Sequence, residues 1–214
     1  MLRLLTNHLC QQWRDAPTAG YRFRHLWDAV ILNLSFFGLL RKSDAAALSW
    51  KDVQTDRFHH YVLITIPRSK TDQAGEGVTI PVLLTAPAAH HDWTDLWWAY
   101  VDLFNDRRGA AFLPSTSCPS HGRRCVIWEK PLQHQALGQI LPRRLEDLRK
   151  HHLLPDLHGS FASHSLRRGG STWMGSRGAP EELQRLLGRW STAIWRRYCD
   201  TPWPTMLGEL ANVA

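Results

Sequence analysis

The stretch Ser163–Asp200 reads SHSLRRGGSTWMGSRGAPEELQRLLGRWSTAIWRRYCD, and the rest of the chain is best interpreted from it. His164 and Arg167 lie three residues apart in it, and Tyr198 follows Gly188 by ten residues. A phenol is a weak nucleophile at neutral pH unless neighbouring groups activate it. Arginine donors bind the oxygens of a phosphate in short, charge-assisted hydrogen bonds. A tyrosine preceded by such basic residues therefore predicts attack on a phosphodiester.

The order of these residues resembles the catalytic domain of tyrosine recombinases, the phage-type integrases. The matching pattern is H-x-L-R, a short helix, L-x-G, and a tyrosine ten residues after the glycine, which here are His164, Leu166, Arg167, Gly188 and Tyr198. The G-R-W spelling is most similar to eukaryotic versions carried by Crypton-type mobile elements. The resemblance implies an α+β, mainly helical fold with a small antiparallel β-sheet or hairpin.

A second motif lies in FFGLLRKSDAAALSWKDV, at residues 36–53. Gly38 is expected to end one helix, and Ser43 to cap the next one with Asp44 in its first turn. Arg41 then lies at the turn between two helices, where a lone arginine usually faces water. The stretch resembles the first arginine motif of the family. It departs in having two leucines between the glycine and the arginine, and Asp44 where members often have Glu.

A predicted hairpin carries the candidate lysine. Residues 61–66 and 78–84 are β-branched and apolar, and TDQAGEG between them favours a turn. Pro81 suits an edge strand because it cannot donate to a ladder. Lys70 follows the first strand and would be a solvated surface lysine on its own. By resemblance it is the catalytic lysine, which protonates the departing 5′ oxygen.

Helical spacing of apolar residues predicts further helices over 23–37, 90–104 and 132–154, with Pro142 starting a new helix in the last of these. Ser163 or Ser165 is expected to cap the helix that holds Arg167. Residues 1–20 read as an N-terminal arm or linker remnant, and 21–214 as the catalytic domain. The helical DNA-clamping domain that usually precedes it is expected to be missing from this chain.

The chain carries 26 Lys and Arg against 19 Asp and Glu, a formal charge of +7, and most of the cations are Arg. Such a balance favours a polyanionic partner, although solvated surface charge gives the same count. The residues expected to contact DNA are Arg168, Arg143, Arg144, Arg123 and Arg124. Scattered cysteines and the lack of a signal or transmembrane segment indicate a protein that is not secreted, nuclear if eukaryotic and otherwise cytoplasmic.

No metal or cofactor is expected. Cys118, His121 and Cys125 do not supply the two tight ligand pairs of a structural zinc site. The histidine pairs at 59–60, 90–91 and 151–152 lack the i, i+4 spacing of a helical metal site, and we expect them at the surface.

The resemblance implies a role for each candidate residue. Tyr198 attacks the phosphorus, while Arg41 and Arg167 hold the non-bridging oxygens. His164 orients the phosphate or accepts the phenol proton. A sixth position, His or Trp in many relatives, falls on Arg189 by strict count or on the adjacent Trp190.

The implied partner is double-stranded DNA, bound by a homo-oligomer, with a separate clamping domain or protein as a further possibility. Two other interpretations stay open: a domesticated DNA-binding protein that has lost the reaction, and an unrelated basic α+β protein. A type IB topoisomerase would share the same chemistry. Formation of a covalent DNA adduct distinguishes these alternatives.

Overall fold

The computed structural model describes residues 1–55, 57–58, 60–67, 77–86, 91–104, 111–117, 125–154 and 161–190. Helix α2 (Ala19–Phe37) runs through the middle of the molecule, and every residue from Leu26 to Leu34 is buried. The predicted helix over 23–37 is confirmed. Thr18 begins it, because its side chain accepts a hydrogen bond from the Tyr21 N–H.

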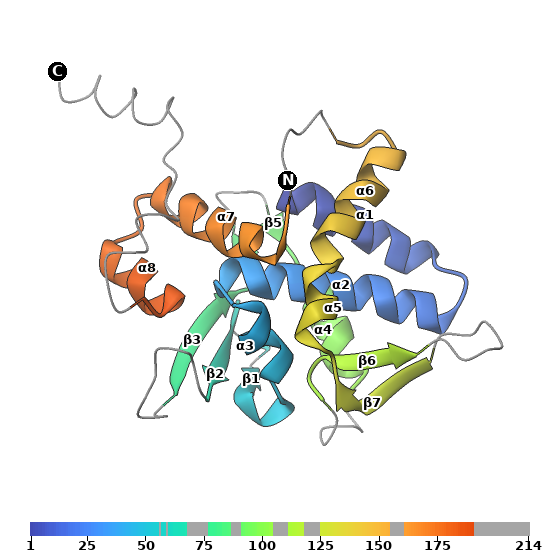
Figure 1. Ribbon diagram of the computed structural model, residues 1–214, viewed down its shortest axis with the longest axis horizontal. Helices are drawn as coiled ribbons and strands as arrows, with labels where there is room; N and C mark the ends of the chain where they lie inside the picture. The colour runs from blue at the N-terminus through green and yellow to red at the C-terminus, as the bar shows by residue number, and fades with distance from the viewer. Residues whose placement is uncertain are drawn as a thin grey trace.

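The other elements surround α2 (Figure 1). In chain order they are α1 (Leu2–Asp15), α3 (Lys42–Ala47), η1 (Trp50–Asp52), β1 (Val53–Thr55), β2 (Tyr61–Ile66), β3 (Val78–Leu83), β4 (Thr85–Ala86), β5 (His91–Asp92), α4 (Thr94–Asp102), β6 (Pro114–Ser117), β7 (Cys125–Pro131), α5 (His134–Gly138), α6 (Ile140–Lys150), α7 (Ser163–Gly175) and α8 (Glu181–Gly188). Within the described residues, no helix is both long enough and apolar enough to cross a membrane.

The predicted hairpin is confirmed as the antiparallel pair β2–β3, with Ile64 opposite Ile80. The sheet has the order β1-β2-β3, so Pro81 lies on an edge strand as expected. Residues 68–76, which include Lys70, lie outside the described residues.

The apolar stripe over 90–104 is core, as predicted, but the helix begins only at Thr94. His91 and Asp92 instead form β5, paired with β4. His91 is 5 % exposed, and its Nε2 lies 2.7 Å from the Asn33 Oδ1. The expectation that it is a surface residue is therefore wrong. Burial lowers the pKa of His91 to about 4, so the ring is neutral at pH 7.

The first twenty residues, expected as an arm, contain helix α1. It packs against α2, with Leu5 and Leu9 buried. The Asn33 amide donates a buried hydrogen bond of 3.0 Å to the Thr6 hydroxyl, which joins the two helices. Polar partners are needed there because an unpaired buried amide costs about 1–3 kcal/mol. Helix α1 therefore shares one core with α2.

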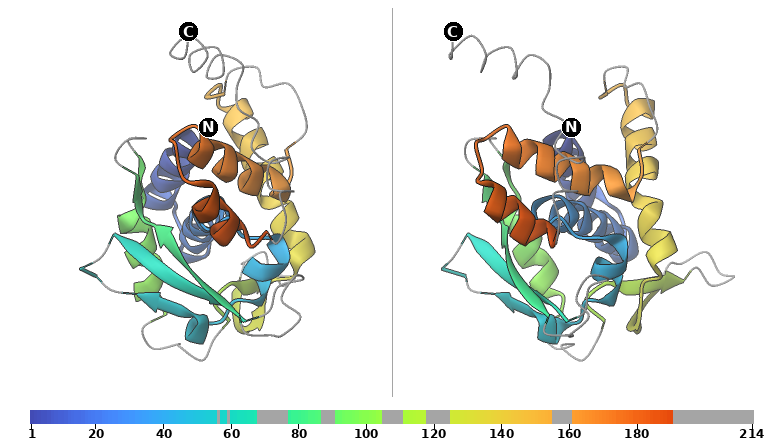
Figure 2. Two further views of the ribbon diagram at one scale, coloured as in Figure 1. Left: turned by 90° about the vertical axis from the view of Figure 1, so that its left-hand side faces the viewer. Right: turned by 60° about the vertical axis from the view of Figure 1, so that its left-hand side comes forward.

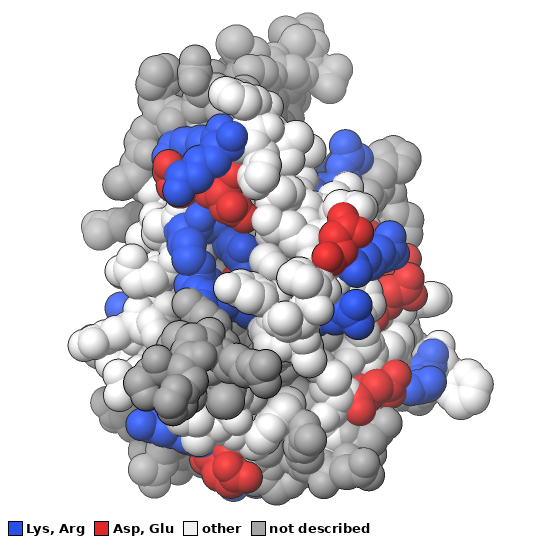
Figure 3. Space-filling model, turned by 90° about the vertical axis from the view of Figure 1, so that its right-hand side faces the viewer, with Lys and Arg blue, Asp and Glu red and all other residues white. Residues whose placement is uncertain are grey.

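Helix α6 carries two of the arginines expected to contact DNA, but only Arg143 is exposed. Arg144 is 6 % exposed, and its Nε donates to the buried Asp28 at 2.6 Å. Arg143 bonds the same carboxylate at 2.8 Å, although 40 % of its side chain remains exposed. The surface in Figure 3 accordingly shows Lys and Arg interspersed with Asp and Glu. The expected exposure of Arg144 is wrong, because its guanidinium neutralises a carboxylate on α2.

Helix α7 approaches α2 closely at Gly170. A Cβ at this position would lie 2.2 Å from the Phe36 carbonyl oxygen and 2.6 Å from the Leu39 Cδ2. Atoms cannot approach so closely, so a side chain here would force the helices apart. The glycine thus sets the spacing that brings α7 to the end of α2.

We expect Gly170→Ala to destabilise the fold by roughly 2 kcal/mol or more, through overpacking at this helix contact. Urea denaturation of the purified variant measures the change. Gly138→Ala is the matched control, because a Cβ at Gly138 would meet no atom within 4 Å. Equal stability of the two variants would show that α7 tolerates a wider separation from α2.

Candidate active site

The site begins at the turn between α2 and α3. Gly38 ends α2 with a 2.9 Å hydrogen bond from its N–H to the Leu34 carbonyl. Leu39 then adopts a left-handed backbone conformation, with φ of 46°. Arg41 is the N-cap of α3, so Ser43, predicted as the cap, lies inside the helix instead. The Arg41 backbone N–H donates to the Asp44 carboxylate at 3.4 Å.

Arg167 connects this turn to the end of α8. It lies on α7, is only 2 % exposed, and donates to the carbonyl oxygens of Leu39 and Gly188. The Trp190 ring covers the guanidinium, with its centroid 4.5 Å from the central carbon. A cation–π contact of this kind is worth about 2 kcal/mol when desolvated. The α2–α3 turn, α7 and the end of α8 therefore meet at one arginine. Figure 2 shows that α7 lies against α2 and that α8 lies beside α7.

Arg189 points into the same cluster because of its backbone. It follows α8 in the left-handed conformation, with φ of 54°, a position where glycine is common. Its Nη2 donates to the Asp44 Oδ2 at 2.7 Å and to the Leu39 carbonyl at 3.2 Å. The side chain of Arg189 is 3 % exposed, so this is a buried ion pair.

Burial, opposed by the Asp44 charge and reinforced by Arg41, lowers the pKa of Arg189 to about 10. The guanidinium therefore remains a cation at neutral pH. Both candidates for the sixth position lie in this cluster, Arg189 on Asp44 and Trp190 on Arg167. Arg189 contributes a positive charge to the cluster, whereas the Trp190 ring covers the charged group of Arg167.

Arg41 has a buried donor atom that points to a missing acceptor. Among the described residues, its Nη1 is buried and has no hydrogen-bond partner. Buried polar groups in proteins are almost always paired, so such an atom needs an explanation. Arg189 pairs with the Asp44 carboxylate and shares the Leu39 carbonyl with Arg167. It is close enough to Arg41 for the two charges to interact. A cluster of guanidinium groups of this kind can bind an anion.

His164 lies in the first turn of α7, three residues before Arg167, and is exposed. Residues at this spacing share one side of a helix. The N-cap is Ala162 rather than either predicted serine, and its N–H donates to the Ser165 Oγ at 3.1 Å. Arg168 is exposed beside the cluster.

Tyr198, Lys70, Arg123 and Arg124 lie outside the described residues. Cys118 and His121 do so as well. Of the seven predicted catalytic residues, the structure brings together Arg41, Arg167, Arg189 and Trp190, and it puts His164 on the same helix as Arg167.

Sequence reasoning missed two groups that hold the cluster together. The Leu39 carbonyl accepts from two arginines, and no side-chain pattern can reveal a backbone acceptor. Asp44 was recognised as part of the motif but received no role. Its spacing from Arg41 gives a sequence signal, because an acidic residue at the third helical position caps the backbone N–H.

Comparison with known proteins connects the fold to recombinases. The structure superposes on the XerH site-specific recombinase bound to a palindromic difH substrate in a post-cleavage complex. The TM-score is 0.64 at 15% identity, over 99% of this chain and 50% of that one. A lambda integrase dimer bound to a COC′ core site gives 0.55 at 18% identity, covering 91% and 46%. The Tn1549 transposon integrase in complex with circular intermediate DNA gives 0.54 at 13% identity, covering 95% and 61%.

These identities establish the fold, and the chain spans about half of the length of XerH and of lambda integrase. No curated protein matches the sequence. The sequence model described as "Phage integrase family" matches residues 11–202, most of the chain. The expected tyrosine recombinase catalytic fold is thereby confirmed, and the chain belongs to the phage integrase family.

Proposed function

We propose that the chain cleaves and rejoins DNA through a covalent tyrosine intermediate. The Tyr198 oxygen attacks a backbone phosphorus, forms a 3′-phosphotyrosyl bond, and displaces the 5′ oxygen as a hydroxyl. The observation that supports this most strongly is the buried Nη1 of Arg41, which has no hydrogen-bond partner among the described residues and lies near the charge of Arg189. A phosphate is an anion whose several oxygens can accept hydrogen bonds from such a cluster.

The cluster would act mainly on the transition state. Negative charge builds on the non-bridging oxygens as the phenol approaches, and pre-positioned guanidinium groups stabilise it without rearranging. Burial strengthens this effect because water screens the charges less. Arg167 is held in place by two main-chain carbonyls, so its position does not depend on the substrate.

His164 and Lys70 would handle the protons. His164 accepts or shares the phenol proton, and Lys70 donates one to the departing 5′ oxygen. Arg189 and Trp190 together fill the sixth position. The phosphotyrosyl bond conserves the energy of the broken bond, so attack by another 5′-hydroxyl reverses the step and exchanges strands. No nucleotide or metal cofactor enters this scheme.

The proposed partner is double-stranded DNA. The similar XerH, lambda integrase and Tn1549 integrase structures are all complexes with DNA, and the lambda structure is a dimer. Exposed Arg168 and the exposed part of Arg143 would contact the backbone, with Arg123 and Arg124 as further candidates. We propose a homo-oligomer on DNA that works together with a DNA-clamping domain. The chain spans about half of the length of XerH and of lambda integrase.

The finer assignment, to a Crypton-like mobile element, is supported by the G-R-W spelling at 188–190. In a eukaryotic host such an enzyme would work in the nucleus, and otherwise in the cytoplasm.

The test is incubation with a nicked suicide DNA duplex, in which the displaced fragment diffuses away and traps the covalent product. We expect a protein–DNA adduct stable to denaturation with the unmodified chain and none with Tyr198→Phe. DNA binding without any adduct would favour the domesticated, inactive protein. An adduct that persists in Tyr198→Phe would disprove the assignment of the nucleophile.

A further inference from the structure

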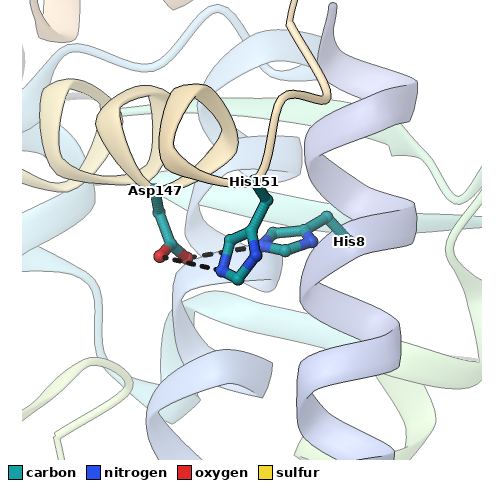
Figure 4. A group of neighbouring side chains, drawn as sticks. All are labelled: His8, Asp147 and His151. Carbon is teal, nitrogen blue, oxygen red and sulfur yellow. Dashed lines mark hydrogen bonds and ion pairs between the residues drawn. The ribbon is translucent and has the colours of Figure 1, made fainter.

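Helices α1 and α6 lie side by side, and three side chains of types that can ligate a metal lie close together between them (Figure 4). His8 comes from α1, Asp147 lies on α6, and His151, four residues later, is the C-cap of α6. The His8 Nε2 is 3.3 Å from the Asp147 Oδ2, and the His151 Nε2 is 3.9 Å from the Asp147 Oδ1. The two imidazole rings have centroids 5.3 Å apart.

These distances fit a shared metal ion. Zinc binds imidazole nitrogen and carboxylate oxygen at about 2.0–2.2 Å in tetrahedral geometry, so two ligand atoms on one ion lie roughly 3.3 Å apart. The three ligand atoms here lie within 4.8 Å of one another. His151 has a 57 % exposed side chain, so its ring can move the short distance that remains.

The surroundings of Asp147 support its use as a ligand. The Gln12 amide donates to its Oδ2 at 2.9 Å, which fixes the carboxylate as outer hydrogen bonds do in metal sites. Burial raises the pKa of Asp147, but the hydrogen bonds from Gln12 and His8 and the charge of Arg144 lower it below its usual value overall. The group is therefore ionised at neutral pH, the form that binds a metal.

Arg144 is the main opposing charge, with its Nη1 3.4 Å from the Asp147 Oδ2. The other two nitrogen atoms of its guanidinium group, Nε and Nη2, contact the buried Asp28 carboxylate at 2.6 Å. Arg143 bonds the same Asp28 carboxylate, which therefore offsets only part of the Arg144 charge. A bound cation would share Asp147 with Arg144.

We propose that His8, Asp147 and His151 bind a divalent first-row metal ion, with Zn²⁺ the best fit to two imidazoles and one carboxylate. The ion connects α1 to α6 and leaves a fourth coordination position for water. Its role is structural: it fastens the N-terminal helix to the core. The residues come from α1 and α6, whereas the arginine cluster is built by the α2–α3 turn, α7 and α8.

The sequence contained part of this signal. Asp147 and His151 have the i, i+4 spacing that helical metal sites use. A comparison of neighbouring histidines only with one another does not detect this pair of Asp and His. The third ligand, His8, is 139 residues away from Asp147 and is found only through the fold.

The experiment uses the whole chain, freed of metal by a chelator and titrated with Zn²⁺ alone in a calorimeter. We expect binding with a dissociation constant in the micromolar range or below, and a melting temperature raised by about 5 °C or more at a hundredfold excess over that constant. Co²⁺ in place of Zn²⁺ should give the visible absorption of a four-coordinate ion.

The variants His8→Gln and His151→Gln should each weaken Zn²⁺ binding at least tenfold and remove the rise in melting temperature. His152→Asn is the matched control: the residue is the exposed neighbour, and asparagine tolerates its φ of 54°. Zn²⁺ binding that is unchanged in both glutamine variants would overturn the proposal. The proposal would also be overturned if no binding is detected at Zn²⁺ concentrations of about 100 micromolar. That result would identify the cluster as an ion pair that binds no metal.

Discussion

Replacing Arg167 with lysine will reduce DNA strand cleavage by about 10³-fold or more, a loss near 4 kcal/mol of transition-state stabilisation. Lysine keeps the charge but lacks the planar fork, so it cannot donate at once to the Leu39 and Gly188 carbonyls. Nor can it stack under Trp190 in the same way. Initial rates of adduct formation on the nicked duplex measure the effect.

Arg177→Lys is the matched control, since Arg177 is an exposed arginine just beyond the end of the same helix. Its rate should stay within about threefold of the unmodified chain. Melting curves of both variants separate loss of chemistry from loss of fold. A folded Arg167→Lys protein that cleaves at the normal rate would show that this guanidinium does not stabilise the transition state.

Replacing Asp44 with asparagine will destabilise the fold by about 3–5 kcal/mol, the usual consequence of removing one partner from a buried ion pair. The change leaves Arg189 as a buried cation without its 2.7 Å carboxylate partner, and it weakens the acceptor for the Arg41 backbone N–H. Urea denaturation at pH 7 gives the free energy of unfolding directly.

Two comparisons make this prediction specific. Asp102→Asn breaks an exposed pair with Arg57 and should change stability by less than about 1 kcal/mol. The double variant Asp44→Asn with Arg189→Met removes both charges, so it should recover at least half of the loss. If Asp44→Asn lowers the free energy of unfolding by no more than Asp102→Asn does, the buried ion pair does not organise the site.

Much of the fold could be predicted from the sequence, because its helices and its hairpin depend on the spacing of residues that are close together in the chain. The apolar positions of α2 recur with helical period, and two β-branched, apolar runs separated by a glycine-containing stretch predict the β2–β3 hairpin. The order of the arginine motifs identified the family, since the resemblance extends over most of the chain. These signals lie within short windows of sequence.

The errors involve contacts between distant segments. Arg144 reads as exposed on its own helix, and only the fold shows that Asp28 lies opposite it. His91 reads as a surface histidine until Asn33 is found against its ring. The Arg189–Asp44 pair likewise depends on a left-handed turn at a position where glycine is expected. Spacing along the chain contains no information about such partners.

The most direct test of the central claim is to identify the atom of the protein that carries the DNA. The trapped adduct is digested with protease and nuclease, and the modified peptide is sequenced by mass spectrometry. We predict a nucleotide joined through its 3′ phosphate to the Tyr198 oxygen, with a free 5′-hydroxyl on the released strand. A link to another residue, or through a 5′ phosphate, would contradict the proposed reaction.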